Sequence, residues 1–141
     1  MRYLGFDLGT RTLGISISDD TKTIASTYTT LHFNDGEYES IFEEIKSIVE
    51  KENIEKIILG LPKNMNNTLG FRAEETMNFK KDLEKYLNIE IVLQDERLTT
   101  VTATNYLLEA DMSRKKRKQV VDKLSANIIL QTYLDIEKGR N

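Results

Sequence analysis

The sequence predicts an α/β domain in which a mixed sheet of five strands lies between layers of helices. Apolar residues alternate with polar or small ones over residues 3–8 and 13–18, which is the period of a strand. Short apolar runs at 55–60 and 89–93 alternate with helical patterns at 37–52 and 71–86, the order of a parallel crossover. A length of 141 residues with 39% hydrophobic residues suits a single domain over residues 1–141.

The first half of the chain predicts three strands, a helix and a fourth strand. Residues 3–8 and 13–18 form a hairpin around the corner Gly9-Thr10-Arg11. Residues 23–31 are rich in β-branched side chains and predict the third strand, which precedes the turn signal at residues 34–36. Five apolar residues between 41 and 49 share one face of a helix over 37–52. The continuous apolar run at 57–59 predicts a strand that is buried on both faces.

The second half predicts three helices and one strand. The helix over 71–86 has as its candidate core residues Met77, Phe79, Leu83, Tyr86 and Leu87. After the strand at 89–93, Thr99 or Thr100 is suited to cap a helix that runs through residue 110. Residues 111–119 form a polar segment, and the last helix is expected over 120–137.

The composition excludes several classes of site. The chain has no cysteine, so it offers no disulfide, thiolate nucleophile or cysteine zinc site, and its single histidine, His32, excludes a multi-histidine metal site. Carboxylates therefore remain as metal ligands, which favours Mg²⁺ or Mn²⁺. A net charge of −3 argues against a protein that merely coats nucleic acid. The sequence shows no membrane-spanning run and no signal-peptide pattern, which predicts a cytoplasmic protein.

Three acidic residues occupy positions where charge is costly. Asp7 interrupts an apolar strand, and Gly5 and Gly9 are expected to keep its face of the sheet open, although a solvated aspartate at a strand end is the alternative. Glu96 follows the last strand at its carboxyl end, where α/β sheets place their sites. Asp122 begins a helical stripe that continues through Ala126, although an aspartate in a first turn also favours the helix dipole. The other members of that stripe are Ser125, Ile129 and Tyr133.

If the three carboxylates converge, their mutual repulsion calls for cations. Two divalent ions roughly 4 Å apart activate a water molecule and stabilise the leaving oxygen of a phosphodiester. Asp7 would bridge the ions, while Glu96 and Asp122 would each hold one.

Four blocks of the sequence resemble the motifs of the YqgF family, the Holliday-junction-resolvase-like proteins that are also named as nucleases of pre-16S rRNA. The blocks are Phe6–Gly14, Gly60–Met65, Asp95–Thr100 and Asp122–Gln131. The resemblance implies a ribonuclease H-like fold with three α/β/α layers, and the family's proposed catalytic acids match Asp7, Glu96 and Asp122. Two departures, Ser125-Ala126 for a usual Ala-Ala pair and Asn67 for a usual glycine, remove no proposed ligand.

Several polar residues are candidates for contact with nucleic acid. Arg11 and Arg97 lie next to the proposed acids, and Lys63 and Asn64 follow a strand end. A basic run precedes the last predicted helix, where positive charge opposes the helix dipole, so we interpret it as a loop that grips a nucleic-acid backbone. A solvated charge run is the alternative. The run consists of Arg114, Lys115, Lys116, Arg117 and Lys118.

Other functions remain open at this stage. Residues 6–10 resemble the first phosphate-binding turn of actin-like and sugar-kinase-like ATPases, but those proteins need two such domains and this chain holds one. A non-catalytic nucleic-acid-binding or transcription accessory module is the second alternative. Within the nuclease interpretation, a resolvase of branched DNA should be a dimer. The chain shows no long heptad, so we expect a monomer or weak homodimer that processes the 5′ end of pre-16S rRNA during ribosome biogenesis.

Overall fold

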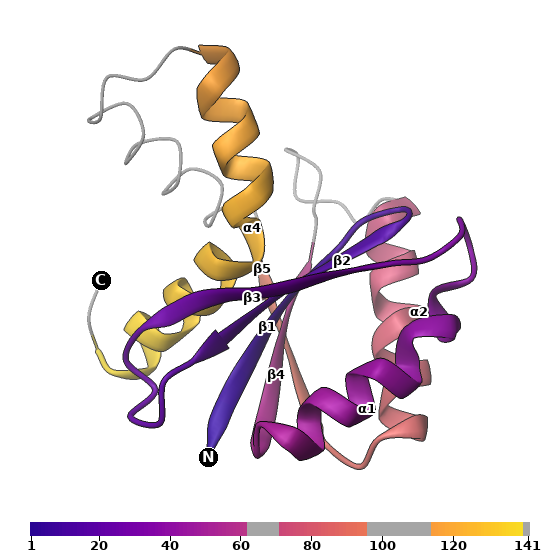
Figure 1. Ribbon diagram of the computed structural model, residues 1–141, viewed down its shortest axis with the longest axis horizontal. Helices are drawn as coiled ribbons and strands as arrows, with labels where there is room; N and C mark the ends of the chain where they lie inside the picture. The colour runs from indigo at the N-terminus through magenta and orange to yellow at the C-terminus, as the bar shows by residue number, and fades with distance from the viewer. Residues whose placement is uncertain (62–70, 96–113, 140–141) are drawn as a thin grey trace.

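The computed structural model describes residues 1–61, 71–95 and 114–139, without the side chains of 71–72, 95 and 114–124. A five-stranded sheet in the order β3-β2-β1-β4-β5 forms its centre (Figure 1). The strands are β1 (Arg2–Leu8), β2 (Thr12–Ser18), β3 (Ala25–His32), β4 (Ile54–Leu61) and β5 (Glu90–Asp95). The helices are η1 (Tyr38–Ile41), α1 (Phe42–Lys51), α2 (Phe71–Tyr86) and α4 (Arg114–Glu137).

The sheet is mixed, as predicted. β1 pairs antiparallel with β2 and parallel with β4, and it therefore occupies the middle of the sheet. β2 continues antiparallel to the edge strand β3, and β4 continues parallel to the edge strand β5. Helices α1 and α2 cover one face, and the second half of α4 covers the other, which gives the expected three layers (Figure 1).

The larger core fills the space between the sheet and the helices α1 and α2. Leu4, Phe6 and Leu8 point to this face of β1 and pack with apolar side chains of both helices. Phe79 of α2 meets Phe6 edge to face, with ring centroids 6.3 Å apart. The predicted buried strand is confirmed, because Ile57, Ile58 and Leu59 are all fully buried and serve both faces of the sheet.

The smaller core lies under α4, which approaches the sheet closely at Gly5. A Cβ atom on Gly5 would lie 2.6 Å from Cβ of Leu130 and 2.8 Å from the carbonyl oxygen of Ala126. The Ser16 hydroxyl, fully buried, donates a 2.7 Å hydrogen bond to that same carbonyl. The expectation that Gly5 leaves the face of Asp7 open is therefore wrong, because the space beside Gly5 is filled by the helix.

A glutamine on α4 ties the helix to the beginning of the edge strand β3. The backbone N–H of Ala25 donates to Oε1 of Gln131 at 2.9 Å, and Nε2 of Gln131 donates to the carbonyl of Thr23 at 2.9 Å. The side-chain amide of Gln131 thus pairs with one backbone N–H and one backbone carbonyl, which is what a neighbouring strand would do. This pair of bonds fixes the height of α4 over the sheet.

Two predictions about the helices need correction. Met77 and Tyr86 are 43% and 46% exposed rather than in the core, because the buried stripe of α2 passes through Ala73 and the predicted Phe79 and Leu83. The prediction that Leu87 is buried is also confirmed. The expected helix over 37–52 begins with the 3₁₀ turn η1, and α1 itself begins at Phe42. The helix expected from Thr99 or Thr100 lies outside the described residues.

The basic run lies in a helix rather than in the loop that we expected. Helix α4 begins at Arg114, so residues 114–118 form its first turns, six residues before the predicted start. Lysine and arginine are good helix formers, and no glycine or proline interrupts the run, so the helical pattern extends through it. Among the described residues, no helix combines the length and apolarity needed to cross a membrane.

Candidate active site

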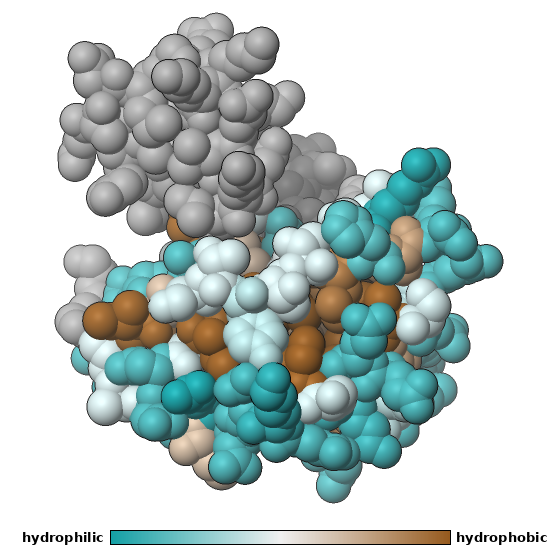
Figure 2. All heavy atoms as spheres, in the orientation of Figure 1, coloured by the Kyte–Doolittle hydropathy of each residue, from teal (hydrophilic) through white to brown (hydrophobic). Residues whose placement is uncertain are grey.

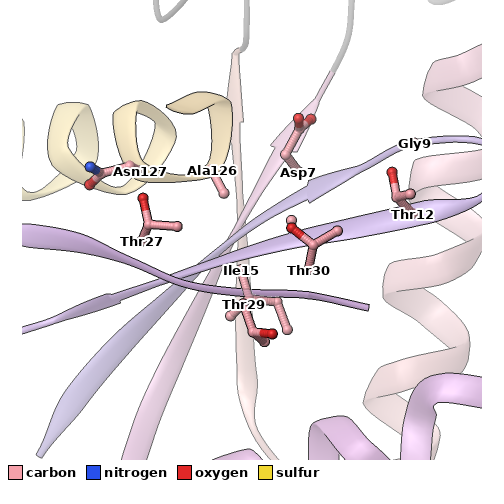
Figure 3. A pocket seen from close by; sticks show the side chains of 10 residues that line it. Asp7, Gly9, Thr12, Ile15, Thr27, Thr29, Thr30, Ala126 and Asn127 are labelled. Atoms are coloured by element: carbon pink, nitrogen blue, oxygen red, sulfur yellow. The ribbon is translucent and has the colours of Figure 1, made fainter. Parts of the chain in front are cut away.

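Asp7 lies near the end of the central strand β1, on the face that α4 covers. Its side chain is partly exposed and forms part of the wall of a cavity of about 470 Å³. Figure 3 shows Asp7, Thr12, Thr27 and Thr30 on the same side of the sheet, with Ala126 and Asn127 of α4 next to them. Because water reaches the carboxylate, Asp7 avoids the penalty that a fully buried, unpaired charge would incur.

Two glycines shape the surroundings of Asp7. Gly14 is the partner of Asp7 on β2, and a Cβ atom there would lie 3.8 Å from Cβ of Asp7 and 3.6 Å from Cβ of Ala126. Because Gly14 has no side chain, the cavity extends down to the backbone of β2 beside the Asp7 carboxylate. Gly9 closes the hairpin, since its N–H donates to the carbonyl of Thr12 at 2.7 Å. A Cβ atom on Gly9 would come within 2.9 Å of the Thr12 hydroxyl oxygen, so the tight turn favours glycine.

Helix α4 supplies the second wall of the cavity. Ala126 is buried against the sheet and Asn127 is partly exposed, and both line the cavity. The Ser16 hydroxyl donates a hydrogen bond to the backbone carbonyl of Ala126 in α4. Ser16 lies on β2, two residues after Gly14, which pairs with Asp7. The wall is therefore positioned by a buried hydrogen bond to the same strand that forms the floor.

The structure describes the side chain of neither of the other two proposed acids, Glu96 and Asp122. Glu96 lies outside the described residues, and Asp122 lies in α4, one turn before Ala126, with its side chain outside the description. Within residues 1–61, 71–95 and 114–139, no three histidine, cysteine, aspartate or glutamate side chains gather as a metal site would require. The convergence of Asp7, Glu96 and Asp122 therefore stays a prediction.

The donor chemistry at Asp7 nonetheless fits a hard divalent cation. A carboxylate on the wall of a cavity of this size leaves room for an ion that keeps part of its water shell, as Mg²⁺ does. Among the described residues that line the cavity, the side chains offer only oxygen and amide groups as metal ligands, which disfavours the softer metals that prefer sulfur.

The predicted nucleic-acid contacts fall into three groups. Arg11 is exposed in the turn between β1 and β2, and its carbonyl accepts a 2.9 Å hydrogen bond from the N–H of Phe33. Lys63, Asn64 and Arg97 lie outside the described residues. The run at 114–118 forms the beginning of α4, the helix whose residues 126 and 127 border the cavity.

Sequence reasoning missed the polar residues that share the cavity with Asp7. These are Thr12, Thr27, Thr29, Thr30 and Asn127. The high threonine content of residues 23–31 indicated a strand, but not which threonines face Asp7. That assignment depends on an irregularity in the pairing of β2 with β3, which the residue pattern does not reveal.

The comparison with known families decides where the chain belongs. Residues 1–136 match the family model RuvX, which is described as Holliday junction resolvase. This chain belongs to the RuvX family. The resemblance to YqgF proteins is thereby confirmed. A Clostridium botulinum relative named "Putative pre-16S rRNA nuclease" is 51% identical over 96% of this chain and 97% of its own length. A Staphylococcus aureus relative of the same name is 50% identical over 95% of both chains.

Solved structures support the same fold for this RuvX protein. Thermus thermophilus RuvC, solved with a Holliday junction substrate, aligns with a TM-score of 0.59 at 10% identity, over 99% of this chain and 96% of RuvC. At that identity the likeness shows the fold alone, and it confirms the ribonuclease H-like architecture that the four sequence blocks implied.

Proposed function

We propose that this RuvX protein is a metal-dependent nuclease that hydrolyses phosphodiester bonds at the 5′ end of pre-16S rRNA during ribosome biogenesis. The observation that carries the proposal is the position of Asp7, a partly exposed carboxylate next to Gly14 on the wall of a cavity at the central sheet. The names of relatives that are 50–51% identical over nearly the whole chain support the choice of substrate.

Asp7, Glu96 and Asp122 are the residues that we propose to hold Mg²⁺ or Mn²⁺, as a pair of ions. Bound ions of this kind supply an activated water molecule and stabilise the leaving oxygen. The chain's own contribution is to fix Asp7 on a central strand that is hydrogen-bonded on both sides, which limits the movement of its carboxylate. Position 122 precedes Ala126 by one helical turn, and residues at that spacing share a helix face.

The basic residues supply attraction for the substrate in this proposal. Residues 114–118 place five positive charges at the beginning of α4, although the helix dipole favours negative charge there. Their position is therefore poorly explained by helix stability. Contact with a phosphate backbone explains it better, since each neutralised phosphate releases counterions. Arg11, Lys63, Asn64 and Arg97 are proposed as further contacts.

Branched DNA is the second candidate substrate, because the matching family model is described as Holliday junction resolvase. Two symmetric cuts in a junction would need two sites, and hence a dimer. The proposed rRNA substrate needs only one site, which agrees with the proposed monomer or weak homodimer. Because ribosomal RNA is processed in the cytoplasm of bacteria, we propose that the protein acts there.

The test is a cleavage assay on a small-subunit rRNA precursor with a 5′ extension, in Mn²⁺ or EDTA. We expect wild-type protein to cut only with the metal, and Asp7→Asn to lose at least about a hundredfold in rate, the scale on which losing one charge-stabilising group acts. Asp35→Asn, in an exposed turn, is the matched control and should cut at the wild-type rate.

The outcomes separate the alternatives. Cleavage by Asp7→Asn at the wild-type rate would show that the site is wrong. If the wild-type protein leaves the rRNA intact but cuts a four-way DNA junction, the substrate assignment fails and the chemistry stands. If it cuts neither but binds one of them, the non-catalytic interpretation replaces the enzyme.

A further inference from the structure

Four threonines and an asparagine line the cavity beside Asp7, together with Gly9, Gly14, Ile15 and Ala126. Thr12, Thr27 and Thr30 share the face of Asp7, and we refer to these three threonines as the threonine floor, while Thr29 lines the cavity from the other face of β3. Asp7 is the only charged residue among the described residues that line the cavity. Residues 25–32 of β3 include no lysine, arginine, aspartate or glutamate. Figure 2 shows residues of intermediate hydropathy over β3, with hydrophobic ones next to them and strongly hydrophilic ones farther out.

A bulge in β3 brings two members of the threonine floor to the same face. Ile15 pairs with Thr29 but Ser16 pairs with Thr27, so Tyr28 is an extra residue between them. Residues three apart on a regular strand point to opposite faces, and the extra residue restores Thr27 and Thr30 to the same one. Figure 3 shows both on the side of Asp7, whereas Thr29 points to the opposite side, next to Ile15.

Thr27 and Thr30 are exposed and Thr12 is partly exposed, so solvent or a ligand can reach their hydroxyl groups. Elsewhere the buried Ser16 hydroxyl bonds to Ala126, and the Thr21 hydroxyl bonds to Asp19. Within the part of the chain that the structure describes, the hydroxyls of Thr12, Thr27 and Thr30 have no protein partner. Each can therefore donate one hydrogen bond and accept others from a ligand in the cavity.

The floor extends sideways from Asp7 across two strands. Asp7 pairs with Gly14, and Gly14 pairs with Thr30, so the three residues form one row across β1, β2 and β3. Neighbouring strands lie about 4.8 Å apart, which places Thr30 about 10 Å from Asp7. Gly14 lies between them without a side chain, and the cavity that these residues line has a volume of about 470 Å³.

We propose that the threonine floor binds the ribose of the nucleotide next to the scissile phosphate and distinguishes RNA from DNA through its 2′-hydroxyl. The inference rests on the proposed nuclease function and names the residues that select its substrate. A 2′-hydroxyl both donates and accepts hydrogen bonds, which matches threonine hydroxyls. A phosphate only accepts, and a site built for it would be expected to include lysine or arginine. The floor has neither.

The test compares binding of two strands that differ only at the 2′ position. The probes are a fluorescein-labelled single-stranded RNA from the 5′ precursor region of 16S rRNA and its all-deoxy counterpart with deoxyuridine in place of thymidine. Binding is measured by fluorescence anisotropy with Mn²⁺ in the Asp7→Asn background, which prevents cutting. We expect RNA to bind about tenfold more tightly, and Thr27→Val with Thr30→Val to reduce that preference to about twofold or less.

Controls separate recognition from a structural effect. Ser26→Ala removes a hydroxyl from the same strand at a residue that does not line the cavity, and Thr30→Ser retains the hydroxyl, so both should keep the tenfold preference. If the double variant melts at a lower temperature, Thr12→Val on β2 gives an independent reading. An unchanged RNA preference in the valine variants, or equal binding of both strands by the parent, would overturn the inference. Because binding is read without cleavage, an inactive wild type would count against the proposed function alone.

Discussion

Replacing Gly5 with alanine tests whether α4 is seated on the sheet as described. The new methyl carbon would lie 2.4 Å from the Ser16 hydroxyl oxygen, 2.6 Å from Cβ of Leu130 and 2.8 Å from the carbonyl oxygen of Ala126. Two of these atoms cannot rotate away, so the helix must move. Overpacking of this kind costs about 1–3 kcal/mol, and loss of the hydrogen bond from Ser16 adds about 1 kcal/mol. We expect the free energy of unfolding to fall by about 2–4 kcal/mol.

Gly14→Ala is the matched control, because it adds the same methyl group on the neighbouring strand. Its nearest neighbours would be Cβ of Ala126 at 3.6 Å and Cβ of Asp7 at 3.8 Å, which are ordinary contacts. We expect its stability to stay within about 0.5 kcal/mol of wild type. The methyl group would nevertheless occupy the floor between Asp7 and Thr30, so cleavage should fall.

Thermal unfolding followed by circular dichroism measures both variants. At about 3 °C per kcal/mol for a chain of this size, Gly5→Ala should lower Tm by about 6–12 °C. The close packing of α4 on β1 would be refuted if the Tm of Gly5→Ala stayed within roughly 2 °C of wild type. An equal loss of stability in Gly14→Ala would show that the cavity is filled by protein rather than open.

Three further predictions concern other contacts. Gln131→Ala removes two hydrogen bonds to the backbone of Thr23 and Ala25 and should lower the free energy of unfolding by about 1–3 kcal/mol in urea titrations. Hydrogen bonds from Thr21 and from two backbone N–H groups lower the pKa of Asp19 to about 2. Its contribution to stability is therefore complete above about pH 4 and lost as the pH falls toward 2, so the Tm difference between wild type and Asp19→Asn should shrink over that range. Replacing residues 114–118 with glutamine should weaken RNA binding and flatten its salt dependence, with little change in the rate at saturating substrate.

The sheet could be predicted because the two-residue period and the short apolar runs leave few alternatives. Phe6 and Leu13 must point to the same core once the hairpin is recognised, and both are buried. The beginning of α4 could not be predicted, because a run of lysine and arginine is equally compatible with a helix and with a solvated loop. The exposure of Met77 depended on the rotation of α2 about its axis, which packing decides.

Asp7 could be recognised as a candidate site residue from the sequence, because a charge in an apolar strand is unusual wherever the strand lies. The role of Gly5 was misread because a glycine can make room either for a ligand or for a helix, and only the position of Leu130 distinguishes these cases. Thr27 and Thr30 were missed for a different reason. The bulge at Tyr28 reverses the alternation of faces along β3, and no residue type there announces it.

The hydrogen bond between Ser16 and Ala126 joins residues that are 110 positions apart in the chain, and this separation has a consequence during synthesis. At 5–20 residues per second, about 6–22 s pass between the emergence of the first hairpin and that of the helix that walls the cavity. Until then Tyr3, Ala25 and Ile58 lack their apolar cover. The residues of the threonine floor are therefore synthesised before those of the helical wall. A nascent chain that carries Asp7 but not yet Ala126 therefore lacks a complete cavity.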